Sequence, residues 1–102
     1  MNYEIALIRC DGIGPEVVGE AVKVMEAIGE KVGHTFTYTD VLMGGCAIDA
    51  VGKSYPDGTA EACKACDAVL LGAVGGPKWG HASDPEKGPE TALLSIRRDL
   101  GL

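Results

Sequence analysis

The feature that most constrains the fold is an unbroken apolar run, residues 68–71, which leads into a glycine-rich segment, residues 72–79. A short apolar run bounded by turn residues is typical of a strand that is buried on both faces in a parallel sheet. Ligands bind such sheets at the carboxyl ends of the strands, which is where this segment would lie. Gly75 and Gly76 let a ligand approach bare backbone, and Lys78 adds a positive charge. We therefore predict a ligand-binding loop here, and a plain surface turn is the alternative.

Composition limits the size of the fold and the possible partners. The chain has 102 residues, enough for one small domain, and a net charge of −6. The negative charge argues against nucleic acid or an anionic membrane as the main partner, whereas an anionic metabolite needs only local positive charge. No apolar run approaches the ~20 residues of a membrane-spanning helix, and the amino terminus lacks the basic start of a signal peptide. We expect a cytoplasmic protein.

The first third of the chain predicts a strand followed by a helix. Residues 5–8 form a second apolar run and predict another buried strand. Gly14 and Pro15 suit the start of a helix, and Gly33 suits its end. Within this helix, apolar residues recur every three or four positions and predict the face that packs on the sheet. The members of this face are Val17, Ala21, Val24, Ile28 and Val32.

The middle of the chain predicts a strand, a loop and a short helix. Residues 35–42 alternate, with Phe36 and Tyr38 on one face and Thr37 and Thr39 on the other, and predict a half-exposed strand. Residues 46–58 predict a loop, and Asp57 is expected to cap a short helix over residues 59–65. The resulting order predicts an α/β fold with a mainly parallel sheet and flanking helices, forming a single partial domain over residues 1–102.

The last helix begins at Pro89, after a polar loop over residues 80–88, and carries two stripes. In one interpretation, the leucines of the first stripe belong to the core and its charged residues are solvated. In the other, the second stripe packs on the sheet and the first lines a cleft, where an arginine could hold a substrate carboxylate through two hydrogen bonds. The first stripe is Glu90, Leu93, Leu94 and Arg97, and the second is Ala92, Ile96 and Leu100.

The four cysteines, at positions 10, 46, 63 and 66, are irregularly spaced, so we expect structural thiols rather than a disulfide framework. Cys63 and Cys66 form a C-x-x-C pair near the end of a predicted helix, where the helix dipole favours the neutral thiol. A zinc site would require two further ligands from distant parts of the sequence. No metal ligand is therefore predicted in this chain, and a redox or zinc module remains an alternative.

Three segments together resemble the β-decarboxylating dehydrogenases of the isocitrate and isopropylmalate family. They are Asp-Gly-Ile-Gly-Pro-Glu at 11–16, Leu-Gly-Ala-Val-Gly-Gly-Pro-Lys-Trp at 71–79 and Pro-Glu-Thr-Ala-Leu-Leu-Ser-Ile-Arg at 89–97. The second segment and the leucine pair resemble the isopropylmalate branch, since isocitrate relatives carry polar residues at the pair. The likeness covers essentially the whole chain. Family members are several times longer, so the chain resembles the amino-terminal part of their first domain.

The resemblance implies an enzyme of leucine biosynthesis that oxidises 3-isopropylmalate with NAD and decarboxylates the product to 2-oxoisocaproate. It also implies Mg²⁺ or Mn²⁺ as a cofactor and a homodimeric full-length enzyme. Two groups of residues carry over by position. The cofactor group is Ile13, Gly75, Gly76, Pro77, Lys78 and Glu90, and the substrate group is Leu93 and Leu94 for the isopropyl group and Arg97 for a carboxylate.

Two departures from the family limit what the chain is expected to do. The family usually has glycine at the position of Cys10, where a Cβ perturbs the turn if φ is positive. The catalytic tyrosine and lysine and the metal-binding aspartates lie downstream in the family, so no catalytic residue is assigned here. We expect the chain alone to be inactive and marginally stable. The alternatives are a relative that acts on homoisocitrate, tartrate or isocitrate, and a small non-catalytic α/β module that binds an anion.

Overall fold

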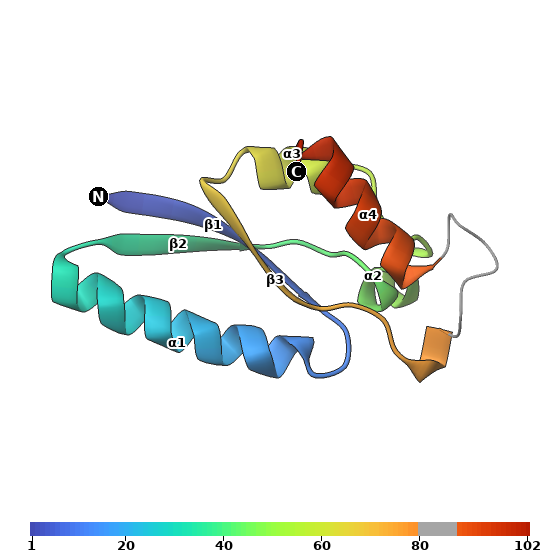
Figure 1. The fold of residues 1–102 in the computed structure, drawn as a ribbon, viewed down its shortest axis with the longest axis horizontal. Coiled ribbons are helices and arrows are strands. Elements are labelled where there is room, and N and C mark those ends of the chain that lie inside the picture. The colour runs from blue at the N-terminus through green and yellow to red at the C-terminus, as the bar shows by residue number, and fades with distance from the viewer. Residues whose placement is uncertain (80–87) are drawn as a thin grey trace.

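A computed structural model describes residues 1–79 and 88–102 and shows a three-stranded sheet with helices on both faces (Figure 1). The prediction of an α/β fold is confirmed. None of the described helices is both long and apolar enough to cross a membrane. In chain order, the elements are β1 (Asn2–Cys10), α1 (Gly14–Val32), β2 (Thr35–Asp40), α2 (Gly45–Val51), α3 (Thr59–Lys64), β3 (Ala68–Ala73), the 3₁₀ turn η1 (Pro77–Trp79) and α4 (Pro89–Asp99).

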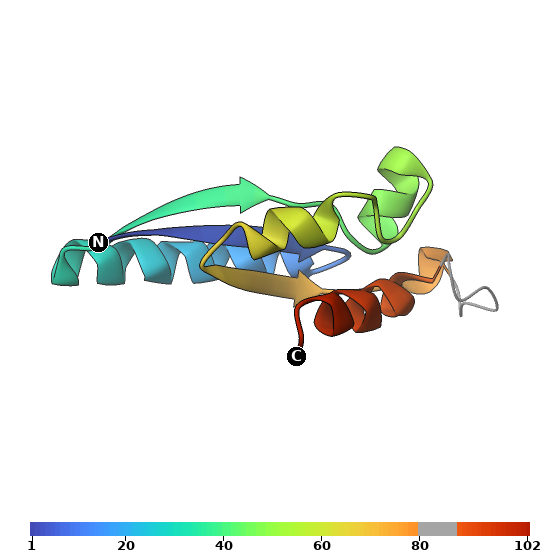
Figure 2. The same ribbon diagram turned by 90° about the horizontal axis from the view of Figure 1, so that it is seen from above.

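The sheet has the order β2-β1-β3, and both pairs of strands are parallel. Parallel neighbours need a crossover connection, which α1 supplies between β1 and β2, and α2 with α3 between β2 and β3. Figures 1 and 2 show α1 on one face of the sheet, with α3 and α4 on the other. The three strands point the same way, so their carboxyl ends meet at one edge. The start of α4, the short α2 and η1 all lie beyond that edge (Figure 1).

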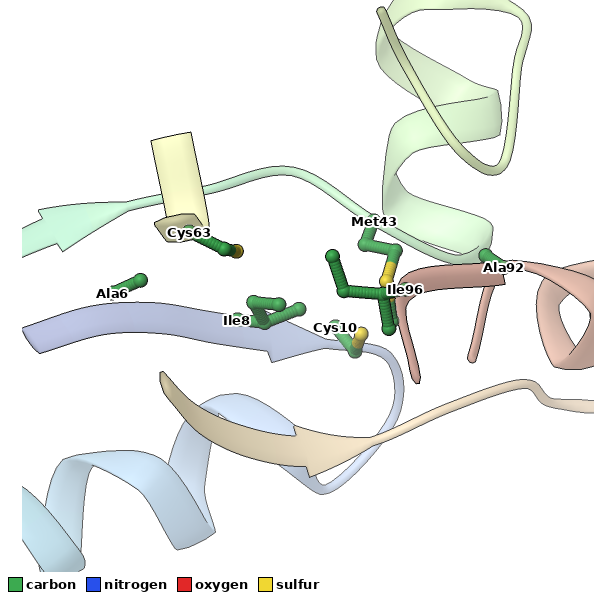
Figure 3. Packing of buried hydrophobic residues seen from close by; sticks show 7 residues of the cluster. All are labelled: Ala6, Ile8, Cys10, Met43, Cys63, Ala92 and Ile96. Carbon is green, nitrogen blue, oxygen red and sulfur yellow. The ribbon is translucent and has the colours of Figure 1, made fainter. Parts of the chain in front are cut away.

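The central strand β1 divides the core into two layers because successive side chains of a strand point to opposite faces. Ile5 and Leu7 pack with Val18 of α1. The other face holds a larger cluster, in which sulfur-containing side chains lie beside the aliphatic ones (Figure 3). That cluster consists of Ala6, Ile8, Cys10, Met43, Cys63, Ala92 and Ile96. Two of the four cysteines are thus buried core residues, as expected for structural thiols.

Helix α1 packs on the sheet through a different face from the one predicted. Four of the five predicted core residues are 51–58% exposed, namely Val17, Val24, Ile28 and Val32. A second apolar stripe, one position further along, faces the sheet instead: Val18 is buried, and Val22 and Met25 pack against the same cluster. Glycines at both ends of this stripe explain the choice. A Cβ on Gly14 would overlap the carbonyl oxygen of Arg9, and one on Gly29 would lie 2.6 Å from that of His34. Only this face lets the helix approach so closely.

The prediction of a loop over residues 46–58 is wrong for its first half. Helix α2 occupies Gly45–Val51 and lies between two glycines with positive φ, Gly44 at 82° and Gly52 at 80°. Glycine adopts such angles at little cost, so the pair starts and ends a helix that has no side-chain cap. Helix α3 is confirmed, but Gly58 is its N-cap residue and Asp57 makes no capping bond.

The two strands beside β1 also differ from prediction. Strand β2 ends at Asp40, two residues earlier than the alternating pattern indicated, although Phe36 and Tyr38 are half-buried as predicted. Strand β3 is only partly buried, whereas its apolar run predicted burial on both faces. Within the described residues β3 is an edge strand, so its side chains lack neighbours on one side. A run of leucine and valine at an edge is unusual, because such edges tend to pair with other strands.

Candidate functional site at the carboxyl edge of the sheet

The loops that follow β1 and β3 leave the sheet side by side. The backbone N–H of Asp11 donates to the carbonyl of Ala73 at 2.8 Å, which ties the two strand ends together. Ile13 and Gly75 each follow this bonded pair by two residues. Ile13 is 62% exposed, so its side chain is accessible at this edge. The prediction that the glycine-rich segment lies at the carboxyl end of a parallel strand is confirmed (Figure 1).

Side chains of the chain itself lie close to Gly75 and Gly76 of this segment. Gly75 has a φ of 88°, and a Cβ there would lie 2.8 Å from Oε1 of Glu90. A Cβ on Gly76 would lie 3.2 Å from the ring of Trp79. The side chains of Glu90 and Trp79 therefore fill the space beside these two backbones, where the sequence suggested that a ligand could approach. Contact of either glycine with a cofactor stays a prediction.

The Lys78 ammonium is paired within the chain. Its Nζ lies 2.7 Å from Oδ2 of Asp49 on α2 and 5.6 Å from the centre of the Trp79 ring. The indole Nε1 of Trp79 donates to the other oxygen of Asp49 at 3.4 Å. The hydrogen bond from Lys78 is the main cause that lowers the pKa of Asp49. Asp49 thus anchors the turn η1, which begins at Pro77, and partly neutralises the cation that was predicted to face an anionic ligand.

Helix α4 resolves the two interpretations of its stripes. Ala92 and Ile96 are buried in the core and point into it in Figure 3. Leu94 is 67% exposed and Leu93 is half-buried, so the interpretation that both leucines belong to the core is wrong.

The predicted site residues therefore lie on the side of α4 that does not face the sheet. Glu90 reaches the glycine-rich segment, and the leucine pair and Arg97 follow about one and two turns further along the helix. Their contacts with a substrate stay predictions. The polar loop over residues 80–88 lies outside the described residues, except for Gly88.

Cys10 has a positive φ, the backbone conformation in which the Cβ of a residue other than glycine perturbs the turn. Its φ is 57°, which costs a residue with a Cβ about 1–2 kcal/mol. Burial is the largest cause that raises the pKa of its thiol to about 12, and the charges of Asp11 and Cys46 raise it further. The thiol is therefore neutral at physiological pH, which suits its place in the core.

Two aspartates that hold the site together were missed by the sequence analysis. Asp49 anchors η1, and the buried Asp11 accepts hydrogen bonds from backbone groups of α2 and of the glycine-rich segment. Asp11 belongs to the Asp-Gly-Ile-Gly-Pro-Glu motif that carries part of the resemblance. For a metal, no three His, Cys, Asp or Glu side chains converge among residues 1–79 and 88–102. The described part of the chain therefore does not fit a metal ion by itself.

An open parallel sheet with loops gathered at its carboxyl edge defines the class of α/β domains that bind small molecules there. The comparisons with known proteins are more specific. Residues 4–102 match the family model described as isocitrate/isopropylmalate dehydrogenase. The chain therefore belongs to the isocitrate/isopropylmalate dehydrogenase family.

Curated relatives and a solved structure agree with this assignment. The chain is 53% identical over its whole length to a 3-isopropylmalate dehydrogenase of Nitratidesulfovibrio vulgaris, and covers 28% of it. It is 55% identical over 99% of its length to one of Clostridium acetobutylicum, again 28% of that protein. A crystal structure of a β-decarboxylating dehydrogenase from Thermococcus kodakarensis, in its apo form, has a TM-score of 0.69 and 31% identity, and matches 97% of this chain and 27% of that one. The chain thus spans about 28% of the length of these curated relatives.

Proposed function

We propose that this chain forms part of an enzyme that oxidises 3-isopropylmalate with NAD and decarboxylates the product to 2-oxoisocaproate, in the cytoplasmic synthesis of leucine. The observation that carries the proposal is the 53–55% sequence identity to two 3-isopropylmalate dehydrogenases, which extends over essentially the whole chain. The exposed side of α4 supports it. A helix that packs through Ala92 and Ile96 leaves a leucine pair and an arginine available to a branched, anionic substrate.

The proposed site residues of α4 contact different parts of the substrate and the cofactor. Leu93 and Leu94 contact the isopropyl group of the substrate, where apolar side chains gain from excluding water. Arg97 holds a substrate carboxylate through two parallel hydrogen bonds. Glu90 lies beside the nicotinamide end of the cofactor, since its carboxyl group is close to Gly75 of the glycine-rich segment.

The cofactor contacts are proposed for the two loops that leave the sheet side by side. They comprise Ile13 on one loop and Gly75, Gly76, Pro77 and Lys78 on the other. When bound, NAD supplies the acceptor for the hydride that leaves the secondary alcohol carbon. Mg²⁺ or Mn²⁺ would need ligands beyond the described residues. The catalytic acid and base are likewise proposed to come from the longer protein, as is its dimer interface, and we expect the 102-residue chain alone to show no turnover.

A chimeric enzyme tests the proposed function. Residues 1–102 replace the matching segment of the Clostridium acetobutylicum relative, and NADH formation is followed with 3-isopropylmalate, isocitrate or tartrate as substrate. We expect turnover with 3-isopropylmalate and little with the other two. A folded chimera that prefers isocitrate or tartrate would reassign the substrate, and one that binds NAD and substrate but never turns over would contradict a catalytic role.

Two neighbouring arginines of α4 provide a matched test of the substrate contact. In the chimeric enzyme, Arg97→Lys removes the planar group that pairs with a carboxylate, and the loss of a charge-assisted bond should raise KM for 3-isopropylmalate about ten- to a hundredfold. Arg98→Lys is the control, because Arg98 is also exposed and contacts Asp99 of its own helix at 3.2 Å. Equal effects of the two changes would argue against the assignment of Arg97.

A further inference from the structure

One buried carboxylate connects three segments at the carboxyl edge of the sheet. Asp11 follows β1 directly and is only 2% exposed. Its Oδ1 accepts the backbone N–H of Cys46 at 2.7 Å, and its Oδ2 accepts those of Gly45 and Gly75, each at 2.8 Å. The first two donors belong to the first turn of α2 and the third to the glycine-rich segment, so a single side chain bonds β1, α2 and this segment together.

The surroundings of Asp11 are shaped to admit this carboxylate. A Cβ on Gly44 would lie 2.8 Å from its Oδ2, and glycine is favoured there in any case by a φ of 82°. A buried carboxylate is costly unless hydrogen bonds replace its lost water, and the three backbone donors supply them. The bond from Gly45 is buried and those from Cys46 and Gly75 are partly buried, so these donors depend on Asp11 as their acceptor.

Gly75 contacts both Asp11 and Glu90, and so links Asp11 to the predicted site. Its N–H is bonded to Asp11, and the space beside its Cα is filled by the carboxyl group of Glu90. The turn η1 is held in a similar way, since the ring of Trp79 packs against Gly45, whose N–H is also bonded to Asp11. A shift of the Asp11 carboxylate would therefore move the segment and change the contacts that Glu90 and Trp79 make with it.

We propose that Asp11 is a positioning residue, which sets the place of the glycine-rich segment and, through Gly75, of Glu90. The inference rests on the proposed function only in taking this segment to be the one that faces the cofactor. Asp11 itself is only 2% exposed and its hydrogen bonds are to backbone groups. Its effect on cofactor binding is indirect.

The only tryptophan of the chain reports on this arrangement. In Asp11→Asn, an amide can present one acceptor oxygen. It keeps either the pair of bonds to Gly45 and Gly75 or the single bond to Cys46, and turns an N–H₂ toward the remaining donors. We expect the Trp79 emission maximum to shift to longer wavelength and its quenching by acrylamide to rise at least twofold. Asp67→Asn is the matched control, because Asp67 accepts the backbone N–H of Glu4 at 2.8 Å at the opposite end of the sheet.

The measurements are made on the 102-residue chain without substrate or cofactor, so a failure of the proposed function leaves their outcome unchanged. Far-ultraviolet circular dichroism establishes that each variant is folded. If Asp11→Asn is folded and leaves Trp79 emission and quenching as in Asp67→Asn, the proposal is overturned.

If Asp11→Asn does not fold, the proposal is tested instead by amide hydrogen exchange in the unaltered chain. The amides of Gly45, Cys46 and Gly75 should exchange at least a hundredfold more slowly than in an unstructured peptide of the same sequence. Exchange at the unstructured rate at these three amides, while those of β1 stay protected, overturns the proposal.

Discussion

Two adjacent valines of α1 offer a direct test of how this helix packs. Val17 is 51% exposed and Val18 is 1% exposed, yet both are in the first turns of the same helix. The sequence pattern assigned Val17 to the core, whereas the structure assigns Val18. Replacing each by alanine removes the same two methyl groups and changes helix propensity by the same amount, so the difference between the variants isolates burial.

The expected sizes follow from these exposures. Two buried methyl groups contribute about 1.6 kcal/mol, and the cavity left beside Ile5 and Leu7 adds to the loss, so Val18→Ala should lower the free energy of unfolding by about 1.5–3 kcal/mol. Val17→Ala loses about half of the transfer contribution and leaves no cavity. Alanine also favours the helix by up to ~0.7 kcal/mol relative to valine, which offsets this loss, so the net change in the free energy of unfolding for Val17→Ala should be close to zero.

Urea unfolding followed by circular dichroism at the helix band measures both variants against the unaltered chain. With a slope of about 1–2 kcal/mol per molar, Val18→Ala should move the midpoint by about 1 M or more, and Val17→Ala should leave it nearly unchanged. If the chain is too unstable for a full transition, equal sucrose in all samples raises the stability of each. A loss for Val17→Ala as large as that for Val18→Ala would refute the packing described for α1.

Two further predictions follow from the site. Ile96→Ala should lower the free energy of unfolding by about 2–5 kcal/mol because the side chain is buried, whereas Leu94→Ala, at a position 67% exposed, should cost less than about 1 kcal/mol; equal losses in urea unfolding would contradict the orientation of α4. The hydrogen bond from Lys78 lowers the pKa of Asp49 below its ordinary value of 3.8. The contact therefore contributes fully to the stability of η1 when the pH is above 3.8, and this contribution is lost as the pH falls through the lowered pKa of the folded state. A fluorescence titration of Trp79 should therefore show a step below pH 3.8 that is absent in Asp49→Asn, and a step at the same pH in both proteins would count against the contact.

Local patterns located every strand and every helix except α2, but they did not show which face of α1 packs on the sheet. The apolar runs located β1 and β3, and the glycine and proline signals located the ends of α1 and the start of α4. Periodicity could not choose between two apolar stripes on α1, because each recurs at helical spacing. The choice depends on Gly14 and Gly29, whose lack of a Cβ matters only once the neighbouring strand ends are in place.

The residues that support the site, Asp11 and Asp49, could not be predicted from the sequence for a related reason. The partners of Asp11 are backbone groups 34 to 64 residues away, and a backbone N–H leaves no mark in the sequence. The pairing of Lys78 with Asp49 likewise depends on α2, which lacks a capping side chain and whose sequence predicts a loop. The outward stripe of α4, by contrast, was among the two predicted arrangements because its pattern repeats within a single helix.

The central place of β1 has a consequence for the order in which the chain folds. Contacts between β1 and β2 join residues 33 positions apart, whereas Asp67, directly before β3, meets β1 across 63 positions. The shorter loop closes at a smaller entropic cost, and α1 lies within it. The unit β1-α1-β2 should therefore form the folding nucleus, and β3 should join late. During synthesis, β1 is already made while its second neighbour is still to be translated, so its open side must avoid wrong pairings until β3 arrives.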